Sequence, residues 1–232
     1  MNGFMNKLEA ILDKYLTPVA EVLNNNIVIS GIKDGMMSTL PATMIASVAL
    51  ILSSFPYLDQ FCPPLSAAFK TFFGPINAAT LGLIALYALL GTAYYYSEGR
   101  QVDKFYGITT AVICFLLVTP FEKATEVAVG EEKIATVISG VIDTGVLGAG
   151  GIFPALVVAI LSISVFAWLE HKNLTIKLPD TVPPNVMKPF LAMIPMGATT
   201  LLFMGIRLLF QMTPYGTLSQ CISLRAPRTL WT

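Results

Sequence analysis

Charged residues are scarce in this sequence. Only 12% of its 232 residues are Asp, Glu, Lys or Arg, against about 25% in a soluble domain. Lys plus Arg and Asp plus Glu each number 14, so the formal net charge is zero. A nucleic-acid-binding protein needs a basic surface that displaces counterions from phosphates. Nucleic acid is therefore not an expected partner.

Cysteine and histidine are also rare. Cys62, Cys114 and Cys221 are odd in number and far apart, and His171 is the one histidine. This pattern excludes a disulfide-stapled secreted scaffold and a Cys/His zinc site. One histidine so placed cannot complete a Ser/His/Asp or Cys/His catalytic set, and no carboxylate pair lies inside an apolar run. We expect no catalytic residues, no metal and no cofactor.

The sequence has instead five long runs without charge, in a chain that is 55% apolar with a mean hydropathy of +0.71. A helix needs about 20 apolar residues to cross a hydrocarbon layer of about 30 Å. A soluble protein of this size would have too little polar sequence to cover five such helices. We predict an all-α, polytopic transmembrane bundle over residues 35–212. The expected spans are residues 35–58, 71–97, 105–121, 144–169 and 189–206, and the last continues to 212.

The segments outside these spans are short. Residues 1–34 are expected to be a cytoplasmic amphipathic segment, with apolar side chains recurring at helical spacing over 4–23. It is too polar to span, and it either lies on the inner membrane surface or packs against the bundle. Within the largest outer loop, residues 122–143, the β-favouring side chains around Gly130-Glu131 indicate a small hairpin.

The positive charges indicate the orientation. With a cytoplasmic N-terminus, the inner segments carry Lys7, Lys14, Lys33, Arg100, Lys104, Lys172, Lys177 and Lys188, and the outer loops carry Lys70, Lys123 and Lys133. Positive charge concentrates on the cytoplasmic side of membrane proteins. We therefore expect a multi-pass protein of the bacterial plasma membrane with its N-terminus inside. Aromatic residues at the span ends, Tyr94 to Tyr96 among them, are expected to be interfacial rings.

Few residues suggest chemistry. His171 could be a phosphate acceptor or a proton relay, but its position beyond the fourth span favours a solvated juxtamembrane residue. Arg207 is either a functional charge within the membrane or a side chain that reaches the interface. Seven glycines are expected to allow close helix packing. For the four between residues 145 and 151, a phosphate cradle is the weaker interpretation. The seven are Gly74, Gly82, Gly91, Gly145, Gly148, Gly150 and Gly151.

Four segments carry a resemblance to a known family. The most specific are LGAGGIF at residues 147–153 and LTIKLPDTVPPNV at 174–186, supported by IKDGMMSTLPATMIASVALIL at 32–52 and YGITTAVICFLLVTPFE at 106–122. Over residues 1–218 the chain resembles the membrane subunit IIC of the bacterial phosphoenolpyruvate-dependent sugar phosphotransferase system, in its lactose, cellobiose and N,N'-diacetylchitobiose branch. Residues 219–232 do not continue the membrane pattern and are expected to be an unrelated or aberrant tail.

The resemblance implies a function. Such a permease imports a β-linked disaccharide such as cellobiose, lactose or diacetylchitobiose, and the IIB component, which works with IIA, phosphorylates it. The family's first half forms the scaffold and the homodimer interface, and its second half binds sugar through a histidine and a glutamate. This chain resembles the first half and has neither of those two residues, so its substrate-binding residues are unknown. It is expected to be a truncated scaffold or dimerisation half in the lipid bilayer.

Two other functions are compatible with the residues. The chain could be a non-transporting membrane scaffold or regulatory partner that acts through a dimer face. It could also be an unrelated small transporter or channel, which would need polar side chains along one face of several spans. The hydroxyls of the first span are scattered, and the second span offers only Thr80 and Thr92 within its interior. The sequence therefore predicts no self-contained polar pathway and no enzyme activity of the chain by itself, although an enzymatic complex could include it.

Overall fold

The computed structural model describes residues 25–54, 63–129, 132–142, 144–172, 174 and 183–212. The amphipathic helix expected at 4–23 and the tail expected at 219–232 lie outside these residues. In chain order the helices are α2 (Ile27–Met37), α3 (Leu40–Ser53), α5 (Pro63–Thr80), η1 (Leu81–Leu83), α6 (Ile84–Gly99), α7 (Lys104–Val118), α8 (Thr144–Leu147), η2 (Ala149–Gly151), α9 (Ile152–His171) and α10 (Pro184–Gln211). The strands β1 (Glu122–Val129) and β2 (Glu132–Ser139) lie between α7 and α8.

The predicted helical membrane bundle is confirmed. Four segments are long and apolar enough to cross a membrane: Ile27–Ser53, Pro63–Gly99, Ala149–His171 and Met187–Gln211. The predicted third span corresponds to α7, which has 15 residues and a length of about 22 Å. It is the shortest of the five expected spans, as the sequence indicated. The second span is longer than predicted, because α5, η1 and α6 form a segment of 37 residues, about 55 Å long.

The first span begins earlier than its charge-free run. Helix α2 starts at Ile27, where the Asn26 side chain accepts hydrogen bonds from the N–H groups of Val28 and Ile29. Lys33 and Asp34 therefore lie inside this helix, with their side chains partly exposed. Charge-free length underestimates such a helix, because charged side chains near a span end can extend to the interface.

The first span is divided between α2 and α3. The Ser38 hydroxyl donates to the Gly35 carbonyl oxygen at 2.6 Å, and the Thr39 hydroxyl to that of Met36 at 2.7 Å. Pro41 follows in the first turn of α3. Proline has no N–H and cannot donate the hydrogen bond that a continuous helix would require at that position. The two hydroxyls satisfy carbonyls at the break.

Close contact between α2 and α6 depends on glycine. A Cβ placed on Gly35 would lie 2.5 Å from the Cα of Thr92, and one on Gly31 would lie 3.1 Å from the Cβ of Tyr96. On the facing helix, a Cβ on Gly91 would meet the Gly35 carbonyl oxygen at 2.5 Å. Small residues spaced by four allow helix backbones to approach in this way.

The packing role predicted for Gly91 is therefore confirmed, whereas the described residues give no such role to Gly74 and Gly82. A Cβ on either residue would meet no atom within 4 Å among the described residues. The sequence shows a glycine's position along a helix, whereas the location of the neighbouring helix decides whether that glycine is needed.

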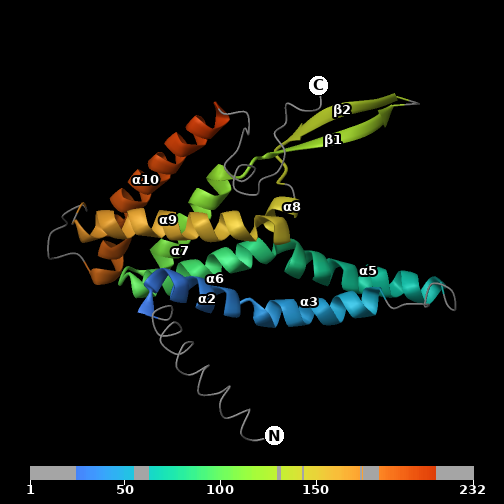
Figure 1. Ribbon diagram of the computed structural model, residues 1–232, viewed down its shortest axis with the longest axis horizontal. Coiled ribbons are helices and arrows are strands. Elements are labelled where there is room, and N and C mark those ends of the chain that lie inside the picture. Colours follow the sequence, from blue (N-terminus) through green and yellow to red (C-terminus); the bar gives the residue numbers. More distant parts are fainter. Residues whose placement is uncertain are drawn as a thin grey trace, which may run out of the picture.

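The buried core lies among α6, α7, α9 and α10. Its largest fully buried side chains include Tyr96, Phe115, Phe166 and Phe203, one from each of these helices. Figure 1 shows α9 lying beside α6, whereas α3 and α5 run together beyond the end of α9. The α3–α5 pair consequently has few buried residues.

The predicted hairpin is also confirmed. Strands β1 and β2 pair antiparallel from Glu122 opposite Ser139 to Val129 opposite Glu132. The Gly140 N–H donates to the Phe121 carbonyl oxygen at 2.8 Å and extends the pairing at the base. The hairpin projects away from the helices (Figure 1).

Candidate functional site

A buried tyrosine joins α6 to α9 near one end of the bundle. The Tyr96 side chain is 1% exposed, and its hydroxyl lies 2.8 Å from the Ser164 hydroxyl. The Nε of Arg100 donates to the Tyr96 hydroxyl at 3.1 Å. Tyr96 was expected to be an interfacial ring, and that prediction is wrong for this residue. Its neighbours Tyr94 and Tyr95 are exposed, because successive helical positions point in different directions.

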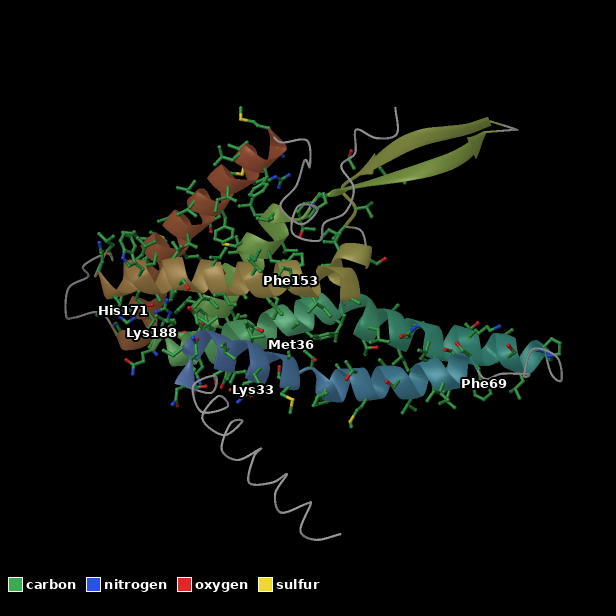
Figure 2. The ribbon with its side chains drawn as sticks, in the orientation of Figure 1. Lys33, Met36, Phe69, Phe153, His171 and Lys188 are labelled. Carbon is green, nitrogen blue, oxygen red and sulfur yellow. The ribbon has the colours of Figure 1, made fainter. Side chains whose placement is uncertain are left out.

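His171 lies at the same end of the bundle. Its side chain is exposed, and its Nε2 lies 3.1 Å from the backbone carbonyl oxygen of Arg100. Figure 2 shows His171 and Lys188 at this end. The exposure agrees with the juxtamembrane interpretation. The structure adds a contact with the turn after α6 that the sequence did not indicate.

A pocket opens beside these groups. It has a volume of about 510 Å³ and is lined by Arg100, Ser164, Val165, Ala167, Trp168, His171 and Leu202. The Nζ of Lys172 lies 4.0 Å from the centre of the Trp168 ring, close enough for a cation–π interaction. The pocket therefore combines a polar end with an apolar wall that α9 and α10 supply.

Most other charges of this end are engaged. The Lys104 Nζ lies 2.7 Å from a Glu98 carboxylate oxygen and 3.1 Å from the Tyr94 hydroxyl. The Asp103 carboxylate accepts from the first N–H groups of α7 and lies 4.0 Å from the Lys188 Nζ. Exposed ion pairs of this kind stabilise a protein weakly, but they concentrate charge at one end of the bundle.

Arg207 contacts a different helix. Its Nη1 donates to the backbone carbonyl oxygen of Leu117, near the end of α7, at 2.6 Å. The last carbonyls of a helix have no intrahelical donor, so the guanidinium satisfies one that α7 leaves open. The sequence left two interpretations of this residue, and the contact gives Arg207 a structural partner within the bundle.

The glycine-rich entry to the fourth span is tightly folded. Residues 144–151 form α8 and η2. A Cβ on Gly151 would overlap the Val146 carbonyl, and one on Gly148 would lie 3.0 Å from the Thr144 carbonyl oxygen. These glycines allow a compact turn, which agrees with the packing interpretation and leaves no support for a phosphate cradle.

Hydroxyl groups along the described spans mostly bond within their own helices. Thr43 and Ser47 donate to carbonyl oxygens of α3, Thr110 to one of α7, and Thr199 and Thr200 to carbonyl oxygens of α10. Among the described residues there is also no group of three His, Cys, Asp or Glu side chains that could hold a metal ion. The exceptions in the second span are Asn77, Thr92 and Ser97, each of which has a buried side-chain oxygen without a hydrogen-bond partner among the described residues.

An apolar groove lies between α3 and α5. It has a volume of about 360 Å³, and its lining residues are Met44, Ile45, Val48, Ala49, Phe73 and Ile76. Several of them are largely exposed, Met44 at 70% and Val48 at 59%. Such a surface requires lipid or another apolar surface against it.

The sequence and the fold both match proteins of known type. The family model for the EIIC component of the phosphotransferase system matches residues 33–230. The oligo-beta-mannoside-specific EIIC component of Bacillus subtilis (strain 168) is 33% identical over 199 residues, which are 85% of this chain and 43% of that protein. The cellobiose-specific EIIC component of Geobacillus stearothermophilus is 29% identical over 229 residues, which are 95% of this chain and 49% of that protein.

A solved structure shares the fold. The crystal structure of ChbC, the IIC component of the N,N'-diacetylchitobiose-specific phosphotransferase system, superposes with a TM-score of 0.79 and 32% identity, over 91% of this chain and 49% of that one. The chain spans about half the length of the relatives that it matches.

Proposed function

Because the chain belongs to the EIIC family of the phosphotransferase system, we propose that it is the N-terminal scaffold and dimerisation half of a permease for a β-linked disaccharide. Cellobiose, lactose and diacetylchitobiose are the candidate sugars, and IIB, working with IIA, is the partner that phosphorylates them. The observation that carries this proposal is the structural match with ChbC. It covers 91% of this chain but only 49% of ChbC.

The polar groups of the described spans support a scaffold rather than a sugar site. A disaccharide is recognised through hydrogen bonds to many hydroxyls, which need free donors and acceptors in the binding site. In the described spans, hydroxyls such as those of Thr110 and Thr199 already donate to carbonyls of their own helices. We therefore place sugar binding outside this half.

Transport assays test this assignment. The chain is expressed in a bacterial strain that has IIA and IIB but lacks its own permease for cellobiose, and uptake of radiolabelled cellobiose is measured. We expect no uptake above the empty vector, whereas the full-length cellobiose relative restores it. Uptake by this chain alone would show that the second half is not needed.

The apolar groove between α3 and α5 is the proposed dimer surface. Its exposed side chains, Met44 and Val48 among them, present a surface that a second copy can cover. The proposed homodimer would bury apolar area on both copies at once, because a two-fold interface uses the same patch twice.

Disulfide crosslinking tests the dimer. In a background with Cys62 and Cys221 changed to serine, Val48→Cys should form crosslinked dimers in native membranes under a mild oxidant. Met193→Cys on α10, which is similarly exposed at 54%, is the matched control and should remain monomeric. Equal crosslinking of the two variants would indicate random collision, and the groove would lose its assignment.

A crosslinked dimer without uptake also fits the alternative of a regulatory scaffold. Restoration of uptake when the chain is fused to the second half of the cellobiose relative would favour the permease.

A further inference from the structure

We propose that the pocket beside Arg100 binds an acidic phospholipid, with the lipid phosphate at the Arg100 guanidinium and an acyl chain along Val165, Trp168 and Leu202. This inference does not depend on the proposed function. It rests on the position of one cation, the chemistry of the pocket wall and the place of the pocket in the bundle.

The guanidinium of Arg100 is held in place by hydrogen bonds to two hydroxyl groups. Its Nε donates to the Tyr96 hydroxyl at 3.1 Å, and one terminal nitrogen lies 3.5 Å from the Ser164 hydroxyl. Within the described part of the chain, Arg100 forms no ion pair with a carboxylate. A guanidinium has five N–H donors in a planar fork that suits phosphate. At least three of these donors remain for a ligand.

The nearby carboxylates are engaged elsewhere or absent from the pocket. Glu98 pairs with Lys104, and Asp103 accepts from backbone N–H groups of α7. Glu170 is not one of the residues that line the pocket. The cations Arg100 and Lys172 therefore give the polar end of the pocket a positive character. Lys172 does not line the pocket itself, but its Nζ contacts the ring of Trp168, which does.

The wall of the pocket is apolar and open to the side. Val165, Ala167, Trp168 and Leu202 form it, and Trp168 and Leu202 are 56% and 45% exposed. A free phosphate would leave this wall uncovered, whereas an amphiphile would cover it. A volume of about 510 Å³ accommodates a headgroup phosphate and part of one acyl chain. The contents of the pocket are therefore expected to be a lipid rather than a soluble ion.

The place of the pocket also fits a headgroup. It lies at the end of α9, where a tryptophan and a lysine are adjacent, and such residues are enriched at the membrane interface. The same end is the predicted cytoplasmic side, where anionic lipids attract basic side chains. A lipid there would contact α6, α9 and α10 through Arg100, Trp168 and Leu202.

Fluorescence quenching provides the test. The chain has two tryptophans, Trp168 and Trp231, so Trp231→Phe leaves a single reporter that lines the pocket. The protein is reconstituted into phosphatidylcholine vesicles that contain a brominated quencher lipid. The quencher is either phosphatidylglycerol or phosphatidylcholine with brominated acyl chains, and both are used at the same mole fraction. We expect brominated phosphatidylglycerol to quench Trp168 with an apparent affinity about fivefold higher, the gain that one cation near an anionic lipid gives.

The variants assign this preference to the pocket. Arg100→Gln should abolish it and Arg100→Lys should retain part of it. Lys188→Gln removes a charge at the same end but outside the pocket, and it should keep the full preference. Val165→Phe fills the apolar wall without changing charge and should reduce the preference. Far-UV circular dichroism checks that each variant is folded. If Arg100→Gln does not fold, Val165→Phe serves as the test of the pocket.

Three results would overturn the proposal. The first is equal quenching by the two brominated lipids in the parent protein. The second is an unchanged preference in folded Arg100→Gln, or in Val165→Phe if Arg100→Gln does not fold. The third is loss of the preference when inorganic phosphate is added at constant ionic strength, because the pocket would then bind a soluble phosphate group. Retention of the preference in phosphate supports the lipid.

Discussion

The guanidinium of Arg207 on α10 donates a hydrogen bond of 2.6 Å to the backbone carbonyl oxygen of Leu117 on α7. The two residues are 90 positions apart in the chain. The positive charge lies at the carboxyl end of a short helix, where the helix dipole favours a cation. This contact therefore joins the last span to the shortest one.

Arg207→Met is expected to weaken the bundle. The change removes a charged donor from the Leu117 carbonyl, and hydrogen bonds to charged groups contribute about 1.5–3 kcal/mol. Unfolding by sodium dodecyl sulfate in mixed micelles, followed by circular dichroism, measures the loss. Arg207→Lys keeps the charge, and its unfolding midpoint should lie between those of the parent and Arg207→Met. A midpoint for Arg207→Met equal to that of the parent would show that the contact contributes nothing.

Gly35→Ala should also destabilise the protein. Its new Cβ would lie 2.5 Å from the Cα of Thr92, so α2 and α6 would have to separate. Overpacking of this kind costs about 1–3 kcal/mol. Gly197→Ala on α10 is the matched control, since a Cβ there meets nothing within 4 Å among the described residues. Both variants are measured by the same detergent titration, and equal midpoints would contradict the packing argument.

Asp103 is expected to stabilise α7 as its N-cap. The carboxylate accepts from the N–H of Phe105 at 3.0 Å and from that of Tyr106 at 3.5 Å. Asp103→Ala should lower the free energy of unfolding by about 1 kcal/mol, whereas Asp103→Asn should retain most of it, because asparagine is an equally good cap. If the two variants unfold at the same detergent fraction, the ion pair with Lys188 and not the cap carries the effect.

Thiol labelling tests the predicted orientation. With Cys62 and Cys221 changed to serine and the buried Cys114 retained, a membrane-impermeant maleimide is added to intact cells. Lys123→Cys in the hairpin should react directly, because the outer loops are expected to include β1. Lys188→Cys should react only after the cells are lysed. The reverse pattern would place the N-terminus outside.

The sequence predicts the spans well because a run of apolar residues requires lipid wherever the chain goes. It also locates the hairpin, since Gly130-Glu131 lies between β-favouring residues. It does not predict that Lys33 and Asp34 lie inside α2, or that α5 and α6 are continuous through η1. Both depend on how far a helix extends beyond the membrane, which charge-free length does not record.

The polar contacts at the bundle end could not be predicted. Tyr96, Arg100 and Ser164 are isolated along the chain, and only the packing of α6 against α9 brings them together. The partner of Arg207 is a backbone carbonyl, which has no signature in a side-chain pattern. The glycines show the same limit, since Gly91 and Gly74 carry the same prediction of close packing but differ in what surrounds them.

The 37-residue segment of α5, η1 and α6 is longer than a straight crossing of the bilayer requires. Its length of about 55 Å exceeds the hydrocarbon thickness of about 30 Å, so a straight rod would have to lean by more than about 50° to remain immersed. Such an inclination is beyond the usual range of up to about 40°. The segment is not one regular helix, because its backbone leaves helical geometry at Leu83 (φ −120°, ψ 19°) between α5 and α6, and Figure 1 shows the two helices at an angle. The two helices can therefore take different inclinations in the bilayer, so the α3–α5 pair, which carries the proposed dimer groove, need not follow the direction of the core helices.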